Sequence, residues 1–322
     1  MRGFDQNDSD IIGQLHGSRT ITILTLLFSV STVHLPTIIR STSLDPIVNI
    51  GIKAARSAGN VLMRCLDSLD RLDVRPKGRH DLVSDADQLS EDTIIEIVRK
   101  HYPGHSIISE ESGAIAGSGD ERDAFEWIID PLDGTLNFLH NHPDFSVSIA
   151  VRKNTVMEHA IVFDPLRNDL YTASRNHGAQ LNGRRIRATN ATSLKRSTIS
   201  LGAPRRNFAH RDRWHERLPH VVKGTGGVRM SGSTALDLAH VASGRTDGFF
   251  QPSLSIWDIA AGSLLVREAK GLVSDCNGQQ EFLENGCVVA AGTGIFSEFL
   301  GMIQSEMGDM TDRSPDGTAG QN

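Results

Sequence analysis

The stretch Trp127-Ile-Ile-Asp-Pro-Leu-Asp-Gly-Thr-Leu-Asn-Phe138 places two carboxylates, a proline and a glycine in a single turn. The run before it, Phe125 to Ile129, is short and mostly apolar, which predicts a buried strand. Because proline has no N–H to donate to a central ladder, we expect this strand to end at Asp130. Asp130 and Asp133 would then lie together at a strand exit, close enough to converge on one cation.

Oxygen ligands of this kind suit Mg²⁺ better than a softer metal. Gly134 lets the backbone approach a ligand closely, and a turn beginning there would direct the Gly134 and Thr135 amides at an anion. However, Asp, Pro and Gly dominate ordinary turns for local reasons. The short pattern Asp-Pro-Xaa-Asp-Gly alone is therefore also compatible with a plain turn between a strand and a loop.

Composition places the chain among soluble globular proteins, with 322 residues, 39% hydrophobic and 22% charged. This length suffices for one large domain or two coupled ones. The net charge of −6 argues against a general polyanion binder, so we expect no direct nucleic-acid contact. The arginine-rich stretch 205–217 also contains Asp212 and Glu216, which favours a solvated helix.

The three cysteines, Cys65, Cys276 and Cys287, are scattered and lack metal-ligand spacing. This usage predicts reduced, buried side chains in a cytoplasmic protein.

Residues 1–44 differ from the rest of the chain. About twenty residues between Arg19 and Arg40 carry no Asp, Glu, Lys or Arg, which is near the minimum for a membrane span. His34 and Pro36 interrupt this run, and three aspartates precede it where a signal peptide would be positive. We therefore expect a dispensable N-terminal extension and no membrane association, with a true span or signal as the alternative.

From Asp45 the apolar residues recur at helical spacing to about Leu69, and a second helix is expected over 88–101. Asp87, just before that helix, could serve as a simple cap. The strand 105–109 is followed by Glu110 and Glu111. A glutamate pair before a glycine is typical of a solvated loop, but Glu110 repeats the position of Asp130 at the end of an apolar strand.

Further elements follow the central motif. Asn182-Gly183 predicts a hairpin turn, Ser233 is a plausible helix cap, and Asp258 stands at the start of a helix where an N-cap role would be ordinary. The tail from residue 303 is expected to be disordered. Strands are expected over 145–152, 156–163, 170–174, 247–251 and 288–291, a loop over 114–122, and a helix over 257–271.

Three separate motifs, in order, resemble the inositol monophosphatase family. They are Ser109-Glu-Glu-Ser112, Asp130-Pro-Leu-Asp-Gly-Thr-Leu-Asn-Phe138 and Trp257-Asp-Ile-Ala-Ala-Gly262. The run 231–274 is most similar to the bacterial SuhB-type subgroup. The resemblance implies an α+β or α/β fold, a layered αβαβα sandwich over residues 45–302 with halves meeting near residue 190. It also implies a homodimer, a requirement for Mg²⁺ and inhibition by Li⁺.

The resemblance also assigns roles to individual residues, with two or three Mg²⁺ ions bound. Glu110, Asp130 and the Leu132 carbonyl would hold one ion, and a second would lie between Asp130, Asp133 and Asp258. Thr135 and Asp87, together with Glu110, would act on the attacking water. The residues that it places at the substrate are Asp133, Gly134, Thr135, Arg229, Gly232, Ser233, Thr234, Gln251 and Asp258. Gln251 departs from the usual glutamate, which predicts weaker recognition of the inositol ring.

The function implied is hydrolysis of a small phosphate monoester, either inositol 1-phosphate or a related polyol or sugar phosphate. Alternative substrates are histidinol phosphate, fructose bisphosphate and nucleotide phosphates. A second class of function is regulatory, because SuhB-type relatives associate with RNA polymerase and the antitermination machinery.

Overall fold

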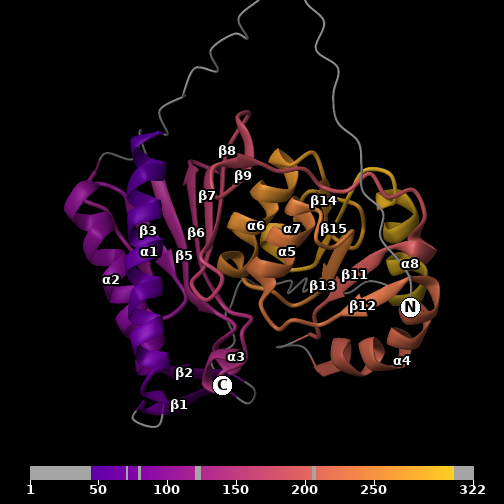
Figure 1. Ribbon diagram of the computed structural model, residues 1–322, viewed down its shortest axis with the longest axis horizontal. Coiled ribbons are helices and arrows are strands. Elements are labelled where there is room, and N and C mark those ends of the chain that lie inside the picture. Colours follow the sequence, from indigo (N-terminus) through magenta and orange to yellow (C-terminus); the bar gives the residue numbers. More distant parts are fainter. Residues whose placement is uncertain (1–44, 70–71, 79–80, 120–124, 205–207, 308–322) are drawn as a thin grey trace, which may run out of the picture. The chain divides into compact units, whose positions relative to one another are not determined.

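The computed structural model describes residues 45–69, 72–78, 81–119, 125–204 and 208–307 (Figure 1). Contacts divide the chain into Met1–Ser43 and Leu44–Asn322, and only the second unit contains described residues. The predicted N-terminal extension therefore lies outside them. Within the described part of the chain, no helix is long and apolar enough to cross a membrane. Cys65, Cys276 and Cys287 are buried, as predicted, and none forms a disulfide.

Two helices cover one face of the larger sheet. Helix α1 (Pro46–Leu66) begins where the Asp45 carboxylate accepts a hydrogen bond from the Ile47 amide at 2.8 Å, with a proline in the first turn. Helix α2 (Asp85–His101) begins three residues earlier than predicted, because Ser84 is its N-cap. Both helices bury apolar side chains against the sheet.

The larger sheet has eight strands in the order β10-β9-β8-β7-β6-β5-β3-β4. Strands β3 and β5 are parallel, and the other neighbours in this sheet are antiparallel. The strands are β3 (Ser106–Ser109), β4 (Gly113–Ile115), β5 (Phe125–Asp133), β6 (Ser146–Lys153), β7 (Val156–Asp164), β8 (Asp169–Ser174), β9 (Gly178–Leu181) and β10 (Arg184–Arg185). A separate hairpin pairs β1 (Val74–Gly78) with β2 (Asp81–Ser84).

The second half of the chain forms a five-stranded sheet in the order β12-β11-β13-β15-β14. Its strands are β11 (Thr198–Leu201), β12 (Gly227–Arg229), β13 (Gly248–Gln251), β14 (Leu272–Ser274) and β15 (Val288–Ala291). The helical elements of the remaining chain are α3 (Thr135–Leu139), η3 (Leu194–Arg196), α4 (Phe208–Gly224), α5 (Thr234–Ser243), α6 (Ile256–Glu268), α7 (Phe282–Asn285) and α8 (Phe296–Met307).

The strand pleat sorts neighbouring side chains into different cores. Trp127 and Ile129 pack with α1 and α2, whereas Ile128 packs on the opposite face with α5 and α6. Phe249 joins this central core, while Phe250 faces α4 and α8. The order is therefore helices, sheet, helices, sheet, helices (Figure 1). This confirms the predicted layered fold.

The prediction that the central strand ends at Asp130 was wrong. Strand β5 continues to Asp133 through an irregularity, because Asp130 pairs with Ser148 whereas Asp133 pairs with Ser146. Two residues of β5, Pro131 and Leu132, thus oppose one residue of β6. Since the parallel pairing with β3 ends at Ile129, Pro131 lies in a bulge and interrupts no regular ladder.

Other differences are local. The predicted loop after Ser112 contains the short edge strand β4, and α8 continues to Met307, so residues 303–307 are helical and not part of a tail. Residues 308–322 lie outside the described residues.

The hairpin at Asn182-Gly183 is confirmed, with both residues at positive φ. Helix α4 covers residues 208–217 of the predicted arginine-rich helix, whereas residues 205–207 and the arginine side chains lie outside the described ones.

Candidate active site

The bulge in β5 places the two motif aspartates on one face of the sheet. Residues three apart on a regular strand point to opposite faces, because side chains alternate. The extra residue in the bulge corrects this, so Asp130 and Asp133 oppose Ser148 and Ser146, which lie two apart on β6. Both carboxylates are buried.

Asp258 completes a cluster with these two aspartates. It lies in the first turn of α6, where Ser255 is the N-cap residue and Asp258 stands at the third helical position, so Asp258 is not itself the N-cap. Its Oδ2 accepts a hydrogen bond from the Ser255 amide at 2.7 Å. One carboxylate oxygen from each of Asp130, Asp133 and Asp258 lies within 4.8 Å of the others.

The electrostatics of this cluster fit a divalent cation. Burial raises the pKa of Asp130 well above its ordinary value, and the negative charges of Glu110, Asp133 and Asp258 raise it further. A bound cation would favour the ionised form and so oppose both effects. Because all the donors are hard oxygens, Mg²⁺ suits this set better than a softer metal.

Glu110 is brought to the same edge of the sheet as Asp130. It follows β3, and its amide donates to the Ile129 carbonyl at 3.2 Å. The turn that carries it is held by Glu91, a buried residue of α2 that sequence reasoning missed. The Glu91 carboxylate accepts hydrogen bonds from the hydroxyls of Ser109 and Ser112 and, at 3.0 Å, from the Glu111 amide.

Helix α2 uses one face to contact three parts of the site. Asp87, Ser90 and Glu91 have the spacing of neighbours on a helix surface. Asp87 Oδ1 accepts from the Thr135 hydroxyl at 2.9 Å, and the Ser90 hydroxyl donates to the Pro131 carbonyl at 2.7 Å. This spacing of polar residues on a helix was the available sequence signal for Glu91, although solvated helix faces show the same pattern.

Asp87 is not the N-cap of α2, because it lies at the third helical position, where it bonds to the N-cap Ser84 and also to Thr135. Its Oδ2 accepts from the Ser84 amide at 2.8 Å and from the Ser84 hydroxyl at 2.6 Å. Burial raises its pKa, and the hydrogen bonds that it accepts oppose this shift. The Thr135 hydroxyl also lies 3.2 Å from the Leu132 carbonyl oxygen, so one proton has two acceptors within reach.

Asp133 connects the two halves of the site, because it caps α5. Its Oδ2 accepts from the Ala235 amide at 2.8 Å and from the Ser233 hydroxyl, and its Oδ1 accepts from the Thr234 amide at 3.1 Å. Ser233 occupies the N-cap position, but its side chain does not cap α5. A carboxylate from β5 does so instead.

The other predicted substrate residues are two glycines, a hydrogen-bonded pair and an exposed arginine. Gly134 and Gly232 both have positive φ, and a side chain at Gly232 would contact Asn137. The Thr234 hydroxyl donates to buried Gln251 Oε1 at 3.1 Å, and Gln251 Nε2 donates to the Ala203 carbonyl at 3.4 Å. Arg229 is exposed at the end of β12, and its Nη1 donates to the Val228 carbonyl.

Comparison with known proteins identifies the family. Residues 43–307 match the model of the inositol monophosphatase family. The Nus factor SuhB of Pseudomonas aeruginosa is 46% identical over 266 residues, which cover 82% of this chain and 98% of that protein. The crystal structure of the extragenic suppressor protein SuhB from Bartonella henselae superposes with a TM-score of 0.77 at 36% identity, covering 81% of this chain and 99% of that one.

A second solved structure, the inositol monophosphatase from Anabaena, superposes with a TM-score of 0.70 at 33% identity. It covers 81% of this chain and 96% of that one. The motifs, the layered fold and the family match agree, and the chain therefore belongs to the inositol monophosphatase family.

Proposed function

We propose that the chain is a Mg²⁺-dependent phosphomonoester hydrolase acting on inositol 1-phosphate or a related small polyol or sugar phosphate. The observation that carries the proposal is the buried cluster of Asp130, Asp133 and Asp258, beside which Glu110 lies close enough to raise the Asp130 pKa. Membership of a phosphatase family supports it independently.

Glu110, Asp130 and the Leu132 carbonyl would hold one Mg²⁺, and Asp130, Asp133 and Asp258 would hold a second. When bound, the metal would lower the pKa of water and stabilise the charge that develops on the phosphoryl oxygens. The overall reaction consumes one water and yields the free alcohol and inorganic phosphate.

The remaining side chains would orient the water and the ester. When the Thr135 hydroxyl donates a hydrogen bond to Asp87 Oδ1, the lone pairs of the hydroxyl oxygen can accept a hydrogen bond from the attacking water. Asp87 would thus fix the direction of the Thr135 hydroxyl. Gly134, with its positive φ, would shape the turn whose amides are directed at the phosphate.

The test is phosphate release from a panel of esters, with Mg²⁺ or with EDTA. The panel contains inositol 1-phosphate, glycerol 2-phosphate, histidinol phosphate, fructose 1,6-bisphosphate and a nucleoside monophosphate. We expect release from at least one small ester in Mg²⁺ and none in EDTA. A folded protein that releases no phosphate from any ester in Mg²⁺ would contradict the proposal.

A second candidate function is regulatory, and the relatives named Nus factors favour it. In this proposal the chain, as a homodimer in the cytoplasm, binds RNA polymerase or an elongation factor. The test is capture of purified polymerase by a folded, phosphatase-dead variant. Capture equal to that by the wild type would show a role separate from catalysis, and no capture by either protein would exclude it.

A further inference from the structure

A short loop between α3 and β6 contacts the glycine of the central motif. A Cβ added at Gly134 would lie 2.9 Å from the Asp144 carbonyl oxygen. The same carbonyl accepts a hydrogen bond from Asn137 Nδ2 at 2.6 Å. The position of Asp144 therefore limits where the turn at Gly134 and the start of α3 can lie.

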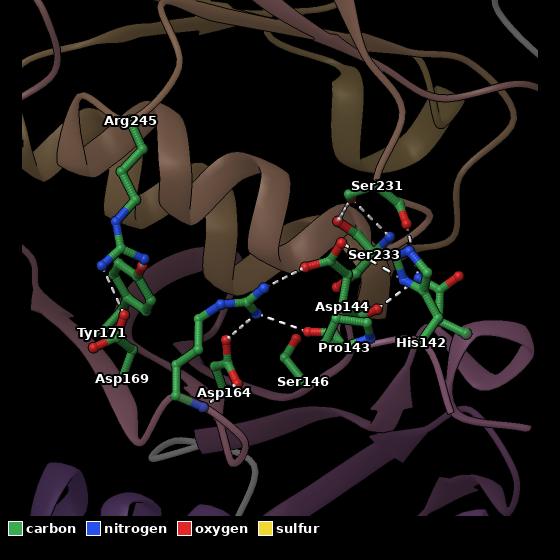
Figure 2. Close-up of polar contacts among 12 residues, drawn as sticks. His142, Pro143, Asp144, Ser146, Asp164, Asp169, Tyr171, Ser231, Ser233 and Arg245 are labelled. Atoms are coloured by element: carbon green, nitrogen blue, oxygen red, sulfur yellow. Dashed lines mark hydrogen bonds and ion pairs between the residues drawn. The ribbon is translucent and has the colours of Figure 1, made fainter. Parts of the chain in front are cut away.

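Asn137 links the loop to Ser231, in the segment that precedes α5. Its Nδ2 also lies 2.7 Å from the Ser231 carbonyl oxygen. The Ser231 hydroxyl accepts from the Ser233 amide at 3.1 Å, and the Ser233 hydroxyl donates to Asp133. Figure 2 shows Asp144 beside Ser231 and Ser233. A displacement of the loop would thus reach both Gly134 and the Asp133 carboxylate.

Arg167, in the turn between β7 and β8, also holds this loop in place, through Pro143 and Asp144. Its Nη1 donates to the Pro143 carbonyl at 2.7 Å, and its Nη2 donates to Asp144 Oδ1 at 2.9 Å. Buried Asp164 orients the guanidinium, accepting from Nη1 at 2.8 Å and from the Arg167 amide at 3.0 Å. The hydrogen bond to Asp164 also raises the pKa of Arg167.

We propose that Arg167 is a positioning residue for catalysis, which holds the loop 142–144 against the Gly134 turn and thereby sets the phosphate-binding turn and Asp133. The claim rests on the proposed phosphatase function for its kinetic test. Within the described part of the chain, the Arg167 guanidinium donates to Pro143, Asp144 and Asp164 and to none of the clustered carboxylates. Its effect therefore depends on geometry, and small displacements near reacting groups lower rates strongly.

Arg245, which Figure 2 shows beside Tyr171 and Asp169, provides a matched control. Its side chain is as exposed as that of Arg167, 40% in each case. Its guanidinium donates two short hydrogen bonds, to the Tyr171 hydroxyl at 2.6 Å and to Asp169 Oδ2 at 2.7 Å, where that of Arg167 donates three. These acceptors belong to β8 and not to the loop, so removing Arg245 deletes one charge and comparable hydrogen bonds without freeing residues 142–144.

The experiment compares Arg167→Ala with Arg245→Ala in the full-length protein. We expect kcat/KM to fall about 10- to 100-fold in Arg167→Ala, mainly through kcat, and less than about threefold in Arg245→Ala. Added guanidinium ion, at a concentration that does not unfold the protein, should restore kcat at least severalfold only in Arg167→Ala. Equal losses in the two variants, or no rescue, would overturn the proposal.

Amide hydrogen exchange gives a readout that is independent of activity. We expect residues 134–145 to exchange faster in Arg167→Ala than in the wild type and unchanged in Arg245→Ala. If the wild type hydrolyses no ester, the proposed function fails, whereas the exchange measurement still decides whether Arg167 fixes the loop. Unchanged exchange in Arg167→Ala would refute the proposal even if phosphatase activity is present.

Discussion

Helices α2 and α6 begin in the same way and end up in different parts of the site. Each has a serine at the N-cap and an aspartate at the third helical position, and the aspartate accepts the serine amide, at 2.8 Å for Asp87 and 2.7 Å for Asp258. Asp87 then receives the Thr135 hydroxyl, whereas Asp258 joins two further carboxylates. Local sequence therefore determines the cap, and only the tertiary fold determines what chemistry the aspartate can serve.

Helix α5 is capped by a carboxylate from another element and not by its own capping box. The largest effect is expected from changing that carboxylate. Because the cap of α5 is Asp133, the variant Asp133→Asn loses a proposed metal ligand and places an amide group beside the N–H donors of α5. We expect metal-dependent turnover to be abolished and the melting temperature to fall. Phosphate-release assays and thermal unfolding check both. Activity within about tenfold of wild type, or about 1.4 kcal/mol of barrier, would exclude the metal role of Asp133.

Asp87→Asn should have a smaller effect, because the helix start can keep its acceptor while Thr135 loses a charged partner. We expect kcat to fall about 100-fold. Since burial raises the pKa of Asp87 above its ordinary value of 3.8, the wild-type rate at saturating Mg²⁺ should decline with acidification at a pH above that value. A pH–rate profile of Asp87→Asn that kept this decline would assign it to another group.

Gln251 is the last residue of β13, the strand that precedes α6. Its amide oxygen accepts from Thr234 at the start of α5, and a carboxylate there would strengthen bonds from substrate hydroxyls. We expect Gln251→Glu to raise the preference for inositol 1-phosphate over glycerol 2-phosphate about five- to fiftyfold, or roughly 1 to 2 kcal/mol. Values of kcat/KM for both esters measure this preference, and an unchanged ratio would remove residue 251 from substrate recognition.

The smallest effect is expected from deleting residues 1–44. Both capped helices and all the proposed ligands lie in the second unit, which begins at Leu44. The shortened protein should fold and retain phosphate release within about twofold of the full-length chain, because no proposed site contact is removed. Circular dichroism and the ester assay test this. Loss of folding would show that the extension is structural, and recovery of the full-length chain with membranes would indicate an anchor.

The sequence could identify the proposed ligands but not how they are brought together. Asp130, Asp133 and Asp258 stand in short, distinctive motifs, so their chemistry was accessible. The bulge that turns Asp130 and Asp133 to one face depends on pairing with β6, which no local pattern encodes. Glu91 and Arg167 were missed because their acceptors and donors are distant in sequence, and each looks like an ordinary surface residue.

The most direct test of the account is Mg²⁺ titration of the wild type, Asp258→Asn and Asp87→Asn, with phosphate release as the signal. Both variants keep a side-chain oxygen that can cap the helix. We predict that Asp258→Asn raises the Mg²⁺ concentration for half-maximal activity at least about tenfold, whereas Asp87→Asn lowers kcat and leaves that concentration unchanged. Equal Mg²⁺ requirements in all three proteins would contradict the placement of Asp258 in a metal centre.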